Sequence, residues 1–165
     1  MQLLFLVMTR KVLLSLLLTF FTAIGCYAQR EQDFASRFMA LYAEGTSLQC
    51  TTVSPLMLER MMQLPNVESD SQTRQVLSQL KSIRMVHNTA DNETSPLYNK
   101  ALKLATRNAA RYKLYAQRQS KRLYVRRRGR YIVEMVLFMK HDRHLQLINL
   151  TGNMTDSFLK QLFNM

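Results

Sequence analysis

The sequence predicts an α+β domain in which helices pack on an antiparallel or mixed sheet of about five strands. Three consecutive β-rich segments between residues 122 and 150 are joined by short turns, which forces antiparallel pairing. Ser-Pro pairs at residues 54–55 and 95–96 each offer an N-cap and a first-turn proline for a helix. Apolar residues at helical spacing mark the other helices. The predicted order of elements is α-β-α-α-β-α-β-β-β-α.

The first half of the predicted domain alternates helices and strands. Phe34, Phe38 and Leu41 recur at helical spacing, and Gly45 follows where such a helix would end. The stretch "LQCTTVS" is short and β-branched, which favours a strand. The Met-rich stretch "MLERMM" in the next helix is expected to pack in the core. The elements predicted here are helices over residues 31–44, 55–64 and 70–80 and strands over residues 48–54 and 82–87.

The second half is predicted to contain a long helix, three strands and a closing helix. Ser95 and Pro96 are expected to open the long helix. Gly129 supplies the positive φ that a tight hairpin needs, and Thr155 is a suitable N-cap for the last helix. The elements predicted here are a helix over residues 97–118, two strands within residues 122–140, a strand over residues 145–150 and a helix over residues 156–164.

The N-terminal residues have the layout of a secretory signal peptide. Residues 12–24 are uncharged and largely apolar, follow two basic residues, and are too few to span a membrane. The stretch "MTRKVLLS" makes Met8 the expected initiator. We therefore expect residues 1–28 to be a signal peptide and residues 29–165 to be a single α+β domain, exported to the periplasm or cell envelope.

Two ways of processing remain open at "AIGCYAQ". In one, Cys26 ends a lipobox and becomes a lipid-anchored N-terminus; in the other, "CYA" is a cleavage box and the mature chain starts at Gln29. The second is favoured, because helical periodicity follows almost at once, without the tether usual in anchored proteins. Either way Cys50 has no cysteine partner within the chain, which excludes a disulfide framework. Cys50 is expected to be a small buried residue of a strand.

Several segments taken together resemble a known protein family. They are "SLQCTTVSPLMLERMMQL", "SIRMVH", the long helix, "VEMVLFMK" and "LQLINLTGNMTDSFLKQL". In this order they are similar to the domain-of-unknown-function family DUF4252, whose members are small exported or lipid-anchored proteins of Bacteroidetes-type bacteria. The resemblance spans residues 34–162. It implies an exported α+β protein with no established activity, so it transfers no catalytic residue. The hairpin reads "VRRRGR" where the family usually carries an acidic or mixed turn.

Positive charge is concentrated in one part of the chain. The formal net charge is +12, yet residues 29–99 contain six basic and eight acidic residues, whereas residues 100–130 contain twelve basic residues and no acidic one. Along the predicted long helix the cations fall within an arc of roughly 80°. Strand alternation puts Arg126 and Arg128 on the same side as Tyr124. The residues predicted to bind anions are Lys100, Lys103, Arg107, Arg111, Arg118, Arg126, Arg127, Arg128 and Arg130.

This basic region has two interpretations. A solvated helix face and a charged strand edge that discourages aggregation explain it without a ligand. A binding surface explains it too, because a concentrated basic field attracts polyanions and arginine suits phosphate and carboxylate groups. Outside the cytoplasm the anions would be lipid headgroups, acidic glycans or an acidic envelope protein. Nucleic acid is the alternative if the signal peptide is misread.

The sequence contains no P-loop, HExxH, nucleophile elbow or paired-carboxylate motif. His141 and His144 flank a predicted turn and are not expected to share a metal ion. We therefore predict no catalytic residue, metal or cofactor, and a non-catalytic cell-envelope interaction module with a basic helix and hairpin. The alternative is a small periplasmic hydrolase or thiol enzyme around Cys50 and a histidine such as His87.

Overall fold

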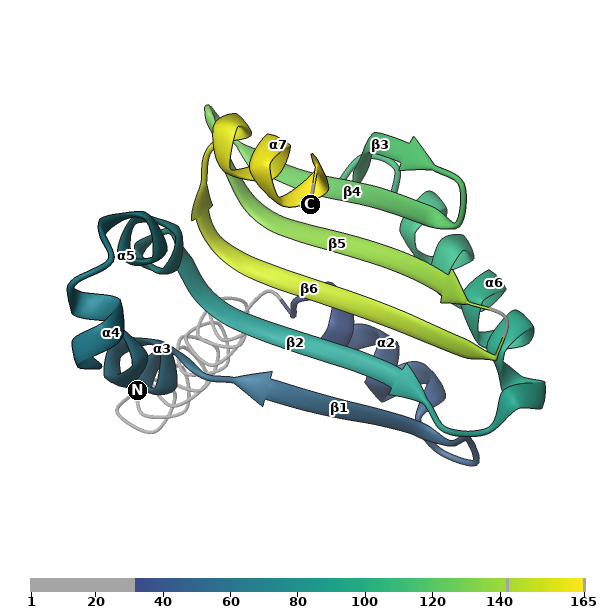
Figure 1. The fold of residues 1–165 in the computed structure, drawn as a ribbon. Helices are drawn as coiled ribbons and strands as arrows, with labels where there is room; N and C mark the ends of the chain where they lie inside the picture. Colours follow the sequence, from purple (N-terminus) through teal and green to yellow (C-terminus); the bar gives the residue numbers. More distant parts are fainter. Residues whose placement is uncertain (1–31, 142, 165) are drawn as a thin grey trace, which may run out of the picture. The chain divides into compact units, whose positions relative to one another are not determined.

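Six strands form one open antiparallel sheet in the computed structural model, which describes residues 32–141 and 143–164 (Figure 1). The order across the sheet is β1-β2-β6-β5-β4-β3, so β1 and β3 are the edge strands. Every neighbouring pair is antiparallel. The strands are β1 (Leu48–Val53), β2 (Leu80–Asn88), β3 (Lys113–Arg118), β4 (Lys121–Arg128), β5 (Tyr131–His141) and β6 (His144–Met154). The α+β class predicted from the sequence is confirmed.

Most helices begin at a polar cap that the sequence supplies. Asp33, Ser54, Asp70 and Thr155 each accept a hydrogen bond from a backbone N–H in the first turn of the helix that follows. The helices are α2 (Phe34–Tyr42), α3 (Pro55–Met62), α4 (Pro65–Glu68), α5 (Ser71–Ser78), α6 (Thr94–Arg107) and α7 (Asp156–Asn164), with a 3₁₀ turn, η1, at Asp91–Glu93.

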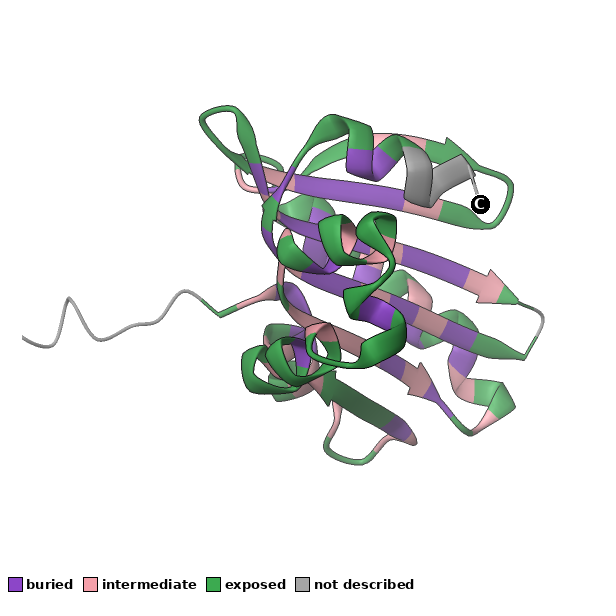
Figure 2. Ribbon diagram, turned by 60° about the vertical axis from the view of Figure 1, so that its left-hand side comes forward, coloured by how far each residue is buried: buried purple, intermediate pink, exposed green. Residues whose placement is uncertain are grey.

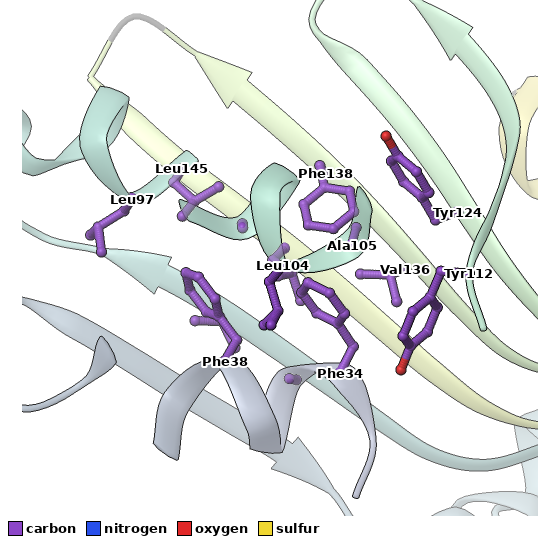
Figure 3. Packing of buried hydrophobic residues seen from close by; sticks show 14 of the residues in the cluster. Phe34, Phe38, Leu97, Leu104, Ala105, Tyr112, Tyr124, Val136, Phe138 and Leu145 are labelled. Carbon is purple, nitrogen blue, oxygen red and sulfur yellow. The ribbon is translucent and has the colours of Figure 1, made fainter. Parts of the chain in front are cut away.

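Helices α2 and α6 cover one face of the sheet, which we call the α2/α6 face, and lie behind it in Figure 1. Phe34 of α2 is buried in the centre of this layer (Figure 3). Its ring meets the rings of Phe138 and Tyr112 edge-on, with centroid distances of 5.3 and 5.5 Å. Such pairs add to the stabilisation that comes from burial, so this aromatic cluster is the principal anchor of α2 on the sheet.

The opposite face, called the α7 face, carries two smaller apolar clusters. Phe158 and Leu159 of α7 are buried with residues of β4, β5 and β6. Leu58, Val67 and Leu77 bring α3, α4 and α5 together beside β1 and β2. Burial of apolar side chains on both faces explains the almost continuous hydrophobic sequence of β5.

The long helix predicted over residues 97–118 is wrong beyond Arg107. The helix ends there, and the backbone N–H of Tyr112 donates to the carbonyl of Asn108 (2.8 Å) as the chain turns. Residues 113–118 instead form β3, which pairs with β4 and gives the sheet a sixth strand. Strand pairing satisfies the backbone at the outer edge of β4, and the turn buries Tyr112 in the core, so tertiary contacts override local helical preference.

Three local expectations are also corrected. Cys50 is exposed rather than buried, because β1 is an edge strand and α2 does not cover this position. In the Met-rich stretch, Leu58 is buried, but Met57 and Met61 are 48% and 39% exposed. The helix α6 begins at Thr94, and Ser95 lies inside its first turn rather than at the cap.

The predicted signal peptide, the initiator Met8 and Cys26 lie outside the described residues. The described residues from Asp33 onward form one compact unit.

Candidate anion-binding surface

The cations predicted to bind anions are distributed over one helix, two strands and the connections between them. In chain order they are Lys100, Lys103 and Arg107 on α6, Arg111 in the connection after it, Arg118 at the end of β3, Arg126, Arg127 and Arg128 at the end of β4, and Arg130 in the turn before β5. The stripe predicted along a single helix therefore stops at Arg107. Arg111 and Arg118 reach the surface from other elements.

Strand β4 separates these cations into two groups. Arg118 pairs with Lys121 at the start of β4, whereas Arg128 pairs with Tyr131 at its end. Seven residue steps separate Lys121 from Arg128, which places them about 23 Å apart along the strand. The structure therefore does not bring Arg118 together with the arginines of the β4–β5 hairpin.

At the hairpin end, a buried carboxylate holds the start of α2. Glu134 of β5 is fully buried, and its Oε1 accepts hydrogen bonds from the backbone N–H of Phe34 (2.6 Å) and from Nδ2 of Asn149 (3.2 Å). The Oδ1 of Asn149 accepts from the next backbone N–H, that of Ala35 (3.0 Å). Two otherwise unpaired N–H groups of the first turn are thereby satisfied, and the negative charge complements the helix dipole.

Two of the predicted anion-binding arginines neutralise this carboxylate. The Nε of Arg126 lies 2.9 Å from Glu134 Oε2, and an Nη2 of Arg111 lies 3.9 Å from the same oxygen. The Tyr112 hydroxyl also donates to it (3.1 Å). Burial, followed by the charge of Glu134, raises the pKa of Tyr112 far above its ordinary value, so this hydroxyl stays protonated as a donor. Their ion pairs with Glu134 therefore hold Arg111 and Arg126 in place, and this role is primarily structural.

Arg127 is also engaged within the chain. Its guanidinium makes a bidentate ion pair with Asp156 in the first turn of α7, with one N–H donating over 3.1 Å. The hydrogen bonds from Arg127 lower the pKa of Asp156, and those to Asp156 raise the pKa of Arg127. Both side chains are largely exposed, so this pair adds little to stability but directs Arg127 toward α7.

The other end of β4 carries a group of cations that we call the turn-end group. It comprises Arg118 and Lys121, which pair at the β3–β4 turn, together with Arg122 and Lys140, which strand alternation places on the opposite face, the α2/α6 face. The backbone N–H of Lys140 donates to the carbonyl of Ser120 (3.2 Å). Lys140 was missed by sequence reasoning because it lies outside the basic run. The pairing register of β4 and β5 places Lys140 beside the β3–β4 turn.

Aromatic rings accompany several of these cations. The Nζ of Lys140 lies 6.0 Å from the ring centroid of Tyr98 on α6, and the Nζ of Lys100 lies 5.2 Å from that of Tyr42. The Arg130 guanidinium lies 5.0 Å from the ring centroid of Tyr131. These contacts orient cationic side chains at the surface.

The contacts of Cys50 do not form a catalytic pair. Its Sγ lies 4.0 Å from the Thr51 carbonyl oxygen and 3.9 Å from the Thr52 hydroxyl. Cys50 lies opposite Val86 in the register, so strand alternation places the neighbouring His87 on the other face of the sheet. Within residues 32–141 and 143–164, no three His, Cys, Asp or Glu side chains gather as a metal site would require.

In the part of the chain that the structure describes, no helix is both long and apolar enough to cross a membrane.

The fold defines a small α+β domain with one open antiparallel sheet. The model of a family described as a domain of unknown function, DUF4252, matches residues 42–162. The match covers more than half of the chain, and the chain therefore belongs to this family, as the resemblance in the sequence indicated. The matched region begins at Tyr42, the last residue of α2. Among curated proteins, none matches the chain.

Proposed function

We propose that this DUF4252 protein is a non-catalytic interaction module of the cell envelope that binds anionic groups through the basic edge of its sheet. The observation that carries the proposal is the uneven distribution of charged residues along the chain, because residues 100–130 hold twelve basic and no acidic residues. They form α6, β3 and β4, so the excess charge lies on one edge strand, its neighbour and one helix. The layout of a signal peptide before the domain supports a location outside the cytoplasm.

The turn-end group is the part of this surface best suited to a ligand. At the opposite end of β4, Glu134 neutralises Arg111 and Arg126, and Asp156 neutralises Arg127. Anionic groups such as lipid phosphates or the carboxylates of acidic glycans match the lysines and arginines of the turn-end group, because each basic residue near an anionic surface contributes about 1 kcal/mol. The contacts of Cys50 favour this role over the thiol-enzyme alternative.

Binding to vesicles tests the proposal. We expect the protein to bind vesicles of phosphatidylglycerol and phosphatidylcholine but not vesicles of phosphatidylcholine alone, with affinity that falls as salt is added. The double substitution Arg118→Ser and Lys121→Ser should weaken binding by about thirtyfold, since two contributions of ~1 kcal/mol are lost. Polygalacturonate in place of vesicles distinguishes a glycan carboxylate from a lipid phosphate.

The matched control is the double substitution Arg74→Ser and Lys81→Ser, which removes the same charge from exposed positions outside residues 100–130. It should weaken binding much less. Equal losses in both double variants, or binding that neither lipid charge nor salt alters, would contradict the proposed surface.

The proposed location has its own test. Mass spectrometry of the protein isolated from cells that express the full sequence should show a chain that begins at Gln29 or at an acylated Cys26. A chain that retains residues 1–28 in a cytoplasmic fraction would contradict export and make nucleic acid the first ligand to examine.

A further inference from the structure

The two edges of the sheet differ in how they are protected against pairing with another strand. Edge strand β3 carries Lys113 and Arg118, and its pairing with β4 contains a bulge. Charges and bulges of this kind prevent an edge from accepting a further strand. Edge strand β1 reads "LQCTTV", without a charge or a proline, and it pairs with β2 along its whole length without a register shift. Strand β1 therefore lacks the usual protection.

The backbone of β1 presents hydrogen-bonding groups to its open side. The backbone N–H of Thr89 donates to the carbonyl of Ser47 (3.3 Å), and these two residues stand opposite each other one step beyond the register of β1 and β2. In an antiparallel pair the hydrogen-bonded positions alternate. Leu48, Cys50 and Thr52 consequently direct their N–H and C=O groups away from β2. Residues 49–52 are exposed, as the colouring of β1 in Figure 2 shows.

Exposed apolar side chains gather on the elements that flank this edge. Among the described residues, seven large hydrophobic side chains are strongly exposed, and five of them belong to α2, to α3 or to the segment just after α3. These five are Leu41, Leu56, Met57, Met61 and Leu64. The α2 helix lies on one face of β1, and the α3–α5 cluster packs on the other. The elements that carry these exposed side chains therefore lie on both faces of the open strand.

We propose that β1 pairs antiparallel with β1 of a second copy of this chain, which joins the two sheets into one across a two-fold axis. A second copy fits this edge because antiparallel pairing of identical strands is inherently two-fold symmetric and an uncharged strand does not repel its own copy. The register that uses all three outward positions places Cys50 opposite Cys50 and Leu48 opposite Thr52. Directly opposed Cα atoms of the two Cys50 residues would then lie about 5.5 Å apart.

Light scattering during size-exclusion chromatography tests this pairing on protein purified from cells that express the full sequence. We expect the mass of two chains for the unchanged protein. The substitution Cys50→Lys should weaken the dimer by about tenfold or more, because two ammonium groups would face each other across the axis. Cys50→Thr, which keeps an uncharged strand residue, should leave the dimer intact. A monomer at all concentrations, or a dimer that Cys50→Lys does not weaken, overturns the proposal.

Two further measurements keep the test decisive if Cys50→Lys fails to fold. A short bis-maleimide should cross-link the Cys26→Ser variant, in which Cys50 is the one cysteine left, into a covalent dimer, and the further substitution Cys50→Thr should abolish this product. Thr52→Pro removes one outward N–H without removing a hydrogen bond to β2 and should dissociate the dimer, whereas Thr52→Val should not. Cross-linking that survives Cys50→Thr, or a dimer that survives Thr52→Pro, overturns the pairing through β1.

Discussion

Replacing Glu134 with glutamine is expected to lower the free energy of unfolding by about 3–5 kcal/mol, the cost of removing one partner of a buried ion pair. Glu134 is fully buried, and the side chains of Arg126 and Arg111 are only 15% and 25% exposed. The substitution keeps the size of the side chain but leaves both guanidinium groups without their shared carboxylate. The first turn of α2 also loses the charge that complements its dipole.

Urea unfolding followed by circular dichroism measures this loss. The matched control is Glu44→Gln, which removes the same charge from an exposed position after α2 and should change stability by less than about 0.5 kcal/mol. If the two variants unfold at the same denaturant concentration, Glu134 does not have the role assigned to it. The comparison also shows how firmly α2, which lies almost wholly outside the family match, is held on the sheet.

The substitution Gly152→Ala is expected to destabilise the protein by about 3 kcal/mol, at the upper end of the usual cost of overpacking. A Cβ atom at Gly152 would clash with the backbone carbonyl oxygen of Gln79. That oxygen accepts a hydrogen bond from the backbone N–H of Asn153 (2.8 Å), so moving the oxygen away from the added Cβ atom would break this hydrogen bond. Gln79 Oε1 also accepts from the backbone N–H of Thr155 (3.0 Å), which couples this site to the start of α7.

The substitution Gly129→Ala distinguishes the cost of an unfavourable backbone conformation from the cost of a steric clash such as that at Gly152. Gly129 has a φ of +57° in the β4–β5 turn, and an added Cβ would meet nothing within 4 Å. Its substitution should cost only about 1–2 kcal/mol, the penalty for a left-handed conformation. Thermal unfolding of both variants provides the measurement. A smaller loss for Gly152→Ala than for Gly129→Ala would show that the backbone of β6 yields easily at this point.

Local signals account for the parts of the fold that were predicted correctly. Ser54 and Thr155 cap their helices because each offers a side-chain acceptor to the next turn, a contact that depends on neighbouring residues alone. The hairpin at Gly129 follows from the same kind of local chemistry. The order of strands β4, β5 and β6 follows from short connections, which leave antiparallel pairing as the one arrangement that the chain can adopt.

Predictions failed where distant contacts outweigh local preference. Residues 108–118 have helical periodicity, yet the chain turns after Arg107 and residues 113–118 form β3, because the outer edge of β4 requires a hydrogen-bonding partner. Cys50 has the sequence surroundings of a buried residue but lies exposed on an edge strand. The residues of a strand do not by themselves determine its position in the sheet. The candidate surface also depends on distant contacts. Glu134 is a single carboxylate, and its partners come from four other segments of the chain.

By itself, the sequence determined the α+β class, most element positions, the family and the concentration of basic charge, since composition, periodicity and capping are properties of neighbouring residues. Only the tertiary structure decided which arginines neutralise Glu134 and Asp156, which cations share one end of β4, and which edge of the sheet is unprotected. These features depend on strand order and register. Both are set by the packing of side chains far apart in the chain, which no local pattern records.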